Sequence, residues 1–188
     1  MKFDTPKEFE SKIKDELPKL CSNDKWCFND LLSLKEYLHS INNHITYLMG
    51  RAFLNKCFGI EEECELEYFK YTEMNHNGYD IVAKIKDSLI IAEIKGNIPC
   101  GKDDKYGANQ KNSIKKDIDN LKIQKTTGKK QINDLSNFED AYKCLVLLEN
   151  NSDAIKDLID DNFVTLKDND ITFENLQNDK INIILIKL

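Results

Sequence analysis

The chain has 188 residues, of which 40% are apolar, and its 27 basic and 33 acidic side chains give a formal net charge of −6. This size and composition suit one domain with a hydrophobic core over residues 1–188, and they exclude a membrane protein, because no apolar run approaches the roughly 20 residues of a spanning helix. Residues 1–19 alternate charged with apolar side chains instead of forming a signal peptide, so we expect a cytoplasmic protein with no membrane partner.

The six cysteines carry no metal or redox motif. None belongs to a Cys-x-x-Cys pair, and none lies in a histidine cluster. A zinc knuckle is therefore not indicated, and we expect reduced thiols. The six are Cys21, Cys27, Cys57, Cys64, Cys100 and Cys144.

Basic charge is concentrated in the middle of the chain. Residues 84–130 carry 12 basic and 6 acidic side chains, whereas residues 1–83 carry 10 and 15, and residues 131–188 carry 5 and 12. The overall charge argues against bulk attraction to nucleic acid. The central segment nevertheless provides one place where a polyanion can dock.

The first half of the chain predicts a helix and three strands. Apolar residues recur at three- and four-residue steps between Leu31 and Phe53, which predicts an amphipathic helix that ends near Gly59. Asn42 and Asn43 could divide that helix in two. The predicted strands span residues 66–71, 79–86 and 89–95.

The second half predicts a helix, a strand, a helix and a strand. After a loop over residues 96–107, Asn112 or Ser113 could cap a helix with an apolar stripe. That stripe is Ile114, Ile118 and Leu121. The remaining elements are a strand at 142–148, a short helix at 154–159 and a strand at 181–188. This order predicts a mixed α/β fold with a central sheet.

Three ionisable side chains are expected on one face of the hairpin formed by the second and third strands. If Asp87 and Ser88 form its turn, Asp80 pairs with Lys95. Because side chains alternate along a strand, Asp80, Glu93 and Lys95 then share a face, and the opposite face is apolar. The apolar side chains are Ile81, Ala83, Ile85, Ile90, Ala92 and Ile94. The charged groups would therefore stand on a buried, rigid support.

Two neighbouring carboxylates on such a support suit a divalent cation. Asp80 and Glu93 repel each other unless a positive charge neutralises them, and their hard oxygens suit Mg²⁺, for which Mn²⁺ can substitute. A metal bound there would polarise a phosphoryl oxygen and acidify a water. Lys95 could orient or deprotonate that water and stabilise charge in the transition state.

The same residues also allow a plainer interpretation. Glu-x-Lys is common in a chain that is 32% charged, and Glu10-Ser11-Lys12 has the same letters. A solvated hairpin edge would then hold an ion pair between Lys95 and Asp80, worth about 0.2 to 1 kcal/mol. The apolar run at 89–92 before Glu93, and the basic helix after it, favour a functional site.

Asp80 followed by Glu93-x-Lys95 at adjacent strand ends resembles the PD-(D/E)xK nuclease superfamily, typified by type II restriction endonucleases. The resemblance covers about residues 31–148 and leaves a C-terminal helix and strand at 149–188; Tyr79 stands where many members have proline. It implies a restriction-endonuclease-like α/β core, in which a central mixed β-sheet is flanked by α-helices.

The resemblance also implies the roles of the site residues. Asp80 and Glu93 would bind Mg²⁺ together with the backbone carbonyl of Ile94, and Lys95 would serve the attacking water. Many members place a further glutamate on the first helix near the metal. The candidates for it are Glu36, with Glu62 or Glu65 as substitutes.

Side chains that follow the proposed site are candidate DNA contacts. Lysines of the basic segment could meet phosphates, and amides could read adenine edges. Solvated lysines and turn-forming amides are the alternative. The candidates are Lys102, Lys105, Asn109, Gln110, Lys111, Lys115 and Lys116, with Lys122, Lys125, Lys129 and Lys130 further along.

These features favour a Mg²⁺-dependent endodeoxyribonuclease that hydrolyses phosphodiester bonds of double-stranded DNA, of the sequence-specific type II restriction kind. A homodimer is expected, because cleavage of two strands needs two sites and the chain holds one. One alternative is a nuclease of DNA repair, junction resolution or another defence system. Another is a catalytically inactive nucleic-acid-binding or protein-interaction module of the same fold.

Overall fold

The computed structural model describes residues 11, 15, 18, 28–61, 68–71, 78–85, 87–97, 106–125, 138–149 and 155–187. The chain divides into two compact units, residues 1–47 and residues 48–188, and each is described by itself. The single domain expected over residues 1–188 stays a prediction. None of the described helices combines the length and the apolarity that a membrane crossing needs.

Helix α2 (Phe28–Phe58) runs from the first unit into the second. It passes through Asn42 and Asn43 without interruption, so these residues do not divide it. The helix ends before Gly59, which has a φ of 68° and donates its N–H to the carbonyl of Asn55 at 2.8 Å. A left-handed glycine is a common helix stop, so the predicted end is confirmed.

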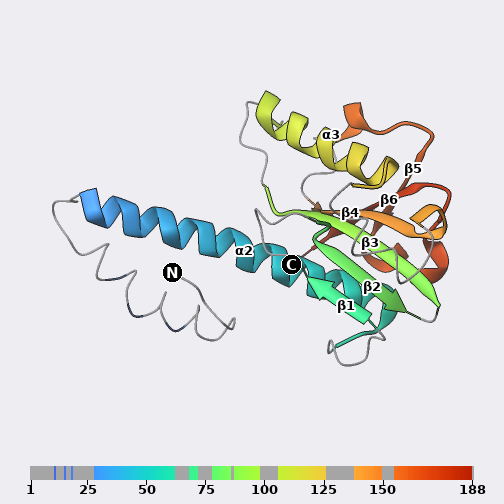
Figure 1. The fold of residues 1–188 in the computed structure, drawn as a ribbon, viewed down its shortest axis with the longest axis horizontal. Helices are drawn as coiled ribbons and strands as arrows, with labels where there is room; N and C mark the ends of the chain where they lie inside the picture. The colour runs from blue at the N-terminus through green and yellow to red at the C-terminus, as the bar shows by residue number, and fades with distance from the viewer. Residues whose placement is uncertain are drawn as a thin grey trace. The chain divides into compact units, whose positions relative to one another are not determined.

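One mixed sheet contains the six strands of the described part of the second unit, in the order β1-β2-β3-β4-β6-β5 (Figure 1). The strands β1, β2 and β3 form an antiparallel meander, whereas β4 is parallel to β3 and to β6, and β5 is parallel to β6. The predicted α/β class with a central mixed sheet is thereby confirmed. The strands are β1 (Tyr68–Tyr71), β2 (Ile81–Ile85), β3 (Ser88–Lys95), β4 (Tyr142–Leu148), β5 (Phe163–Lys167) and β6 (Ile181–Ile186).

Two elements after β4 differ from those expected. Strand β5 was not predicted, because a short edge strand is stabilised by pairing with its neighbour more than by its own sequence pattern. The helix predicted over residues 154–159 is a 3₁₀ helix, Lys156–Leu158, and residue 154 lies outside the described residues. Further 3₁₀ helices are Phe138–Asp140, Asp168–Asp170 and Phe173–Asn175.

Helix α3 (Ala108–Lys122) lies between β3 and β4 in the chain and begins earlier than Asn112 or Ser113. Its N-cap is Gly107, whose N–H donates to the side-chain oxygen Oε1 of Gln110 at 3.0 Å. A glutamine three residues after the cap can satisfy the cap N–H in this way. The amide side chain therefore starts the helix where the sequence analysis expected a loop.

The β2–β3 hairpin is shifted from its expected register. Ile85 pairs with Ser88, and Ile81 pairs with Ala92, so Ser88 belongs to the strand and not to the turn. Asp87 lies in the connection with a φ of 67°, in the left-handed region that aspartate tolerates. Each β2 residue therefore pairs with a β3 residue two positions earlier than predicted. Because side chains alternate with a period of two, this shift leaves every strand side chain on its expected face.

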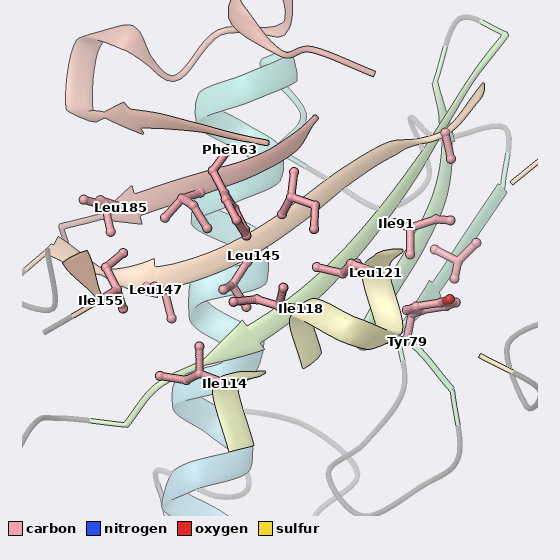
Figure 2. Close-up of a cluster of buried hydrophobic side chains, with 14 of the residues drawn as sticks. Tyr79, Ile91, Ile114, Ile118, Leu121, Leu145, Leu147, Ile155, Phe163 and Leu185 are labelled. Carbon is pink, nitrogen blue, oxygen red and sulfur yellow. The ribbon is translucent and has the colours of Figure 1, made fainter. Parts of the chain in front are cut away.

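Both faces of the sheet are apolar. On one face, the main core lies between the strands and α3 (Figure 2). On the other face, α2 approaches so closely that a Cβ atom on Gly50 would lie 3.0 Å from Cδ1 of Ile81 and 3.1 Å from Cδ1 of Ile94. The largest fully buried members of the main core are Tyr79, Leu89, Ile91, Ile114, Leu121 and Leu145.

Candidate active site

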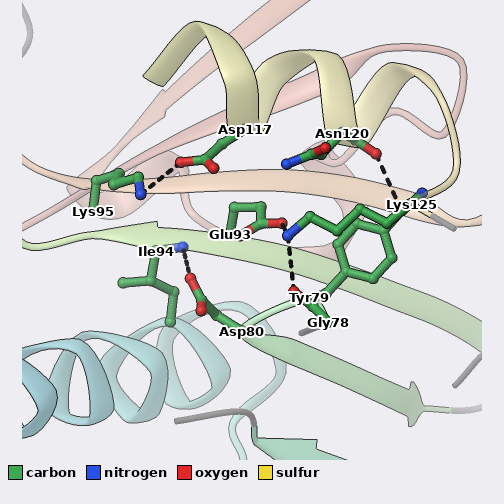
Figure 3. Close-up of polar contacts among 9 residues, drawn as sticks. All are labelled: Gly78, Tyr79, Asp80, Glu93, Ile94, Lys95, Asp117, Asn120 and Lys125. Atoms are coloured by element: carbon green, nitrogen blue, oxygen red, sulfur yellow. Dashed lines mark hydrogen bonds and ion pairs between the residues drawn. The ribbon is translucent and has the colours of Figure 1, made fainter. Parts of the chain in front are cut away.

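Asp80 lies in a bend immediately before β2. Tyr79 and Val82 both belong to the core beside α3, whereas regular alternation would place them on opposite faces. The bend, and not strand alternation, therefore decides where the Asp80 side chain lies. Its carboxylate oxygen Oδ2 accepts a hydrogen bond from the backbone N–H of Ile94 at 2.7 Å (Figure 3). The last backbone pair of the hairpin is Ile81 with Ala92. Beyond that pair, the Asp80 carboxylate accepts the hydrogen bond from β3 that a backbone carbonyl of a longer β2 would accept.

The register corrects the predicted pairing of Asp80. Asp80 falls level with Glu93, where the sequence analysis expected it opposite Lys95. The backbone carbonyl of Ile94 points to the same edge of the strand as its N–H, because both groups of a strand residue face one neighbour. Two carboxylates and one backbone carbonyl therefore gather at this strand end.

Glu93 projects from β3 toward α3 and is almost completely buried, with 4% of its side chain exposed. Its Oε1 atom forms an ion pair with Nζ of Lys125, which follows α3. The same ammonium donates to the carbonyl of Gly78 at 2.8 Å and lies 5.0 Å from the centroid of the Tyr79 ring. Lys125 thus bridges the end of α3 to β3 and to the segment just before β2 (Figure 3).

Lys95 is paired with a helix residue, not with Asp80. Its Nζ atom lies 2.8 Å from Oδ2 of Asp117, which belongs to the buried face of α3. The solvated ion pair between Lys95 and Asp80, considered in the sequence analysis, is therefore not formed, and Lys95 makes a more buried pair with Asp117 instead. Its partner comes from the helix that covers the sheet.

The two strand carboxylates have raised pKa values. Burial, and then repulsion by Asp80, raises the pKa of Glu93 to about 8 although Lys125 opposes the shift. Burial also raises the pKa of Asp80, against the opposing effects of the Ile94 N–H and Lys95. A positive ion beside both groups would remove this cost, because it favours their charged forms.

Lys95 keeps its proton at neutral pH. Burial by itself lowers its pKa, but the contact with Asp117, together with the charges of Asp80 and Glu93, outweighs burial and raises the pKa. A protonated lysine donates hydrogen bonds and stabilises negative charge, and it has no lone pair with which to deprotonate water. Of the two roles expected for Lys95, the structure favours orientation and charge stabilisation.

The donor atoms at this strand end are of the hard-oxygen type that a magnesium ion prefers. Within the described ranges, no three His, Cys, Asp or Glu side chains are grouped as metal ligands. Mg²⁺ does not need three, since it is commonly held by one or two carboxylates and keeps several waters. Asp80 and Glu93, with the Ile94 carbonyl, supply hard oxygens of this kind.

The sequence analysis missed Asp117 and the structural role of Tyr79. Asp117 interrupts the apolar stripe of α3 between Ile114 and Ile118, and a charged residue in such a stripe is a signal that could have identified it. The Tyr79 hydroxyl accepts a hydrogen bond from the N–H of Lys125 at 2.9 Å and donates one to the carbonyl of Asn120 at 3.1 Å. No sequence pattern indicates that contact.

The remaining metal candidates do not join the described site. Glu36 lies in α2 within the first unit, and its side chain is outside the described part of the structure. Glu62 and Glu65 also fall outside the described residues. The assignment of a helical glutamate stays a prediction.

The candidate DNA contacts fall mainly on the first turns of α3. Lys115 and Lys116 are exposed, as is Asn109, whereas Gln110 bonds the N-cap. Lys111 pairs with Asp157 at 3.3 Å. Lys102 and Lys105 lie outside the described residues.

The fold and the site together define an α/β protein with five charged groups clustered at the end of β3, of which Glu93 and Asp117 are buried. Comparison with known proteins finds no matching family model, no matching curated protein and no matching solved structure. Function is therefore argued from the geometry of the chain itself. The five groups are Asp80, Glu93, Lys95, Asp117 and Lys125.

Proposed function

We propose that this chain is a Mg²⁺-dependent endonuclease that hydrolyses phosphodiester bonds of double-stranded DNA. Its core would be of the restriction-endonuclease type, as the PD-(D/E)xK resemblance implies. The element order supports this proposal: α2 is followed by an antiparallel meander, then by α3 and then by β4, which is parallel to β3. The charged cluster lies at the end of β3, the last strand of the meander.

The observation that carries the proposal is the position of Asp80 against the end of β3. The hydrogen bond from the Ile94 N–H holds the Asp80 carboxylate beside the end of β3, just before β2 begins. Glu93 supplies the second carboxylate of the site. The repulsion between the two is costly in a buried place unless a cation binds. This arrangement favours a metal site over a solvated hairpin edge.

Each residue of the cluster has a role in this proposal. Asp80 and Glu93 hold the metal with the Ile94 carbonyl, and the bound ion would acidify a water and polarise a phosphoryl oxygen. Lys95, protonated beside Asp117, orients the water by donating to it and stabilises charge on the phosphorus oxygens. The apolar core between β3 and α3 keeps these side chains in fixed positions.

DNA would approach along α3. Lys115 and Lys116 are exposed on this helix, in the segment 84–130, where 12 basic side chains outnumber 6 acidic ones. Phosphate contacts of this kind position a duplex and carry no sequence information. We further propose a homodimer and a restriction role, with repair or junction resolution as the alternative.

A catalytically inactive DNA-binding module is the second candidate. One observation favours it: Lys125 neutralises Glu93 and Lys95 neutralises Asp117 without any added ion. Such a module would bind duplex DNA and leave it intact. Its binding would be unchanged by Mn²⁺ and by loss of the Asp80 carboxylate.

Cleavage of supercoiled plasmid and genomic DNA with Mg²⁺ tests the proposal. We expect the wild type to nick or linearise DNA, and Asp80→Asn and Glu93→Gln to be at least about a hundredfold slower. Glu139→Gln, which removes an exposed carboxylate outside the cluster, is the matched control and should cleave normally. Discrete genomic fragments indicate restriction, and selective cutting of branched DNA indicates junction resolution. Intact DNA with Mg²⁺ or Mn²⁺ contradicts the proposal.

A further inference from the structure

Lys125 is held in one position by several contacts. Its ammonium pairs with Glu93, donates to the Gly78 carbonyl at 2.8 Å and lies over the Tyr79 ring at 5.0 Å. Only 16% of its side chain is exposed. It therefore differs from the exposed lysines of α3, such as Lys115 and Lys116, which face solvent.

The backbone of Lys125 is fixed as well. Its N–H donates to the hydroxyl of Tyr79 at 2.9 Å, and that hydroxyl donates to the Asn120 carbonyl at 3.1 Å. Tyr79 immediately precedes Asp80 in the chain and is buried in the core. The Tyr79 hydroxyl thus joins the end of α3 to the segment before β2 that carries Asp80.

The Lys125 ammonium is paired with Glu93, one of the two carboxylates proposed to bind the cation. Glu93 is 4% exposed, and its Oε1 atom is the one that Lys125 contacts. Lys95 has a separate partner in Asp117, so it does not occupy Glu93. Lys125 therefore supplies the positive charge on Glu93 that a metal would otherwise supply.

We propose that Lys125 is the resident counter-ion of Glu93 and competes with a divalent cation for that carboxylate. The inference rests on the metal site proposed above and adds the residue that sets its affinity. A metal must displace the ammonium from Glu93 in order to bind there. After displacement, Lys125 can retain the Gly78 carbonyl and the Tyr79 ring, so its release requires no rearrangement of α3.

Calorimetric titration of the full chain with MnCl₂ above pH 8, where the Glu93 carboxylate is largely charged, measures this competition directly. We expect Lys125→Met to bind Mn²⁺ roughly tenfold more tightly than the wild type, because a close competing charge is lost. Lys84→Met is the matched control, since it removes a lysine paired with Asp87 on the same hairpin, and it should bind as the wild type does. Glu93→Gln should abolish the heat in both backgrounds.

Lys125→Met also removes a buried ion pair and can destabilise the fold, so a second variant and a second measurement are needed. Lys125→Gln also removes the charge, but its amide can still donate to the Gly78 carbonyl, and we expect the same tightening. In thermal melts, Mn²⁺ should raise the melting temperature more for both Lys125 variants than for the wild type, because tighter binding to the folded state gives greater stabilisation.

The outcomes separate this inference from the proposed nuclease function. Binding by the Lys125 variants when the wild type is silent supports the competition. Equal or weaker Mn²⁺ affinity in both variants, with Glu93-dependent binding in the wild type, overturns the competition and leaves the metal site standing. Absence of Glu93-dependent binding in every protein overturns both.

Discussion

The Lys95 ammonium and the Asp117 carboxylate lie 2.8 Å apart, one at the end of β3 and the other on the buried face of α3. Asp117 is the charged member of a face that is otherwise formed by Ile114, Ile118 and Leu121. A buried charge of this kind is tolerated only when it is paired. The pair therefore fixes Lys95 between the strand and the helix.

Loss of either partner of this pair should destabilise the chain. We expect Asp117→Leu and Lys95→Met each to lower the free energy of unfolding by about 3 kcal/mol, because each leaves an unpaired charge in a mostly buried place. The double variant should lose much less than the sum of the two. Urea unfolding followed by circular dichroism measures this coupling. Strictly additive losses would show that the two groups do not interact.

Metal affinity should rise with pH. Burial and the neighbouring Asp80 raise the pKa of Glu93 to about 8, so at neutral pH much of the metal-free protein carries a proton that a metal must displace. Mn²⁺ affinity should then fall by up to about tenfold for each pH unit below 8 and level off above it. Titrations in buffers of different ionisation enthalpy count the released protons. An affinity that does not change with pH would contradict the raised pKa.

A larger side chain at Gly50 should destabilise the second unit. A Cβ atom there already meets Ile81 and Ile94 at 3.0 and 3.1 Å, and Gly50→Val adds two methyl groups beyond that Cβ. Overpacking of this kind costs about 1 to 3 kcal/mol. Thermal melts measure the loss, with Ala52→Val on the same helix as the control for a β-branched residue. Equal melting temperatures for the two variants would refute the close packing.

The thiols of Cys57 and Cys144 should resist alkylation in the folded protein. Burial raises the pKa of Cys57 to about 12 and that of Cys144 well above its ordinary value, where Cys57 adds to the shift. The reactive thiolate of Cys57 is then about a thousandfold scarcer than at an ordinary cysteine. Mass spectrometry after iodoacetamide treatment should find both peptides unmodified until denaturant is added. Rapid labelling of either in the native state would contradict their burial.

Local patterns in the sequence determined most of the elements. The apolar run of β4 and the glycine stop after α2 lie where the sequence predicts them. The sequence also placed Glu93 and Lys95 on one face, because alternation along a strand depends on neighbouring residues alone. The start of α3 was wrong by a few residues, since it depends on the side-chain bond between Gln110 and Gly107.

Only the tertiary structure decided which charges meet. Asp80 is placed by a bend and a hydrogen bond to Ile94, while Lys95 and Glu93 take partners from α3 and from the residues just after it. These contacts join elements that are distant in the chain, and they depend on how the helix packs against the sheet. No periodicity within a single segment encodes that packing, so the sequence supplied the charged residues and the packing of α3 assigned their partners.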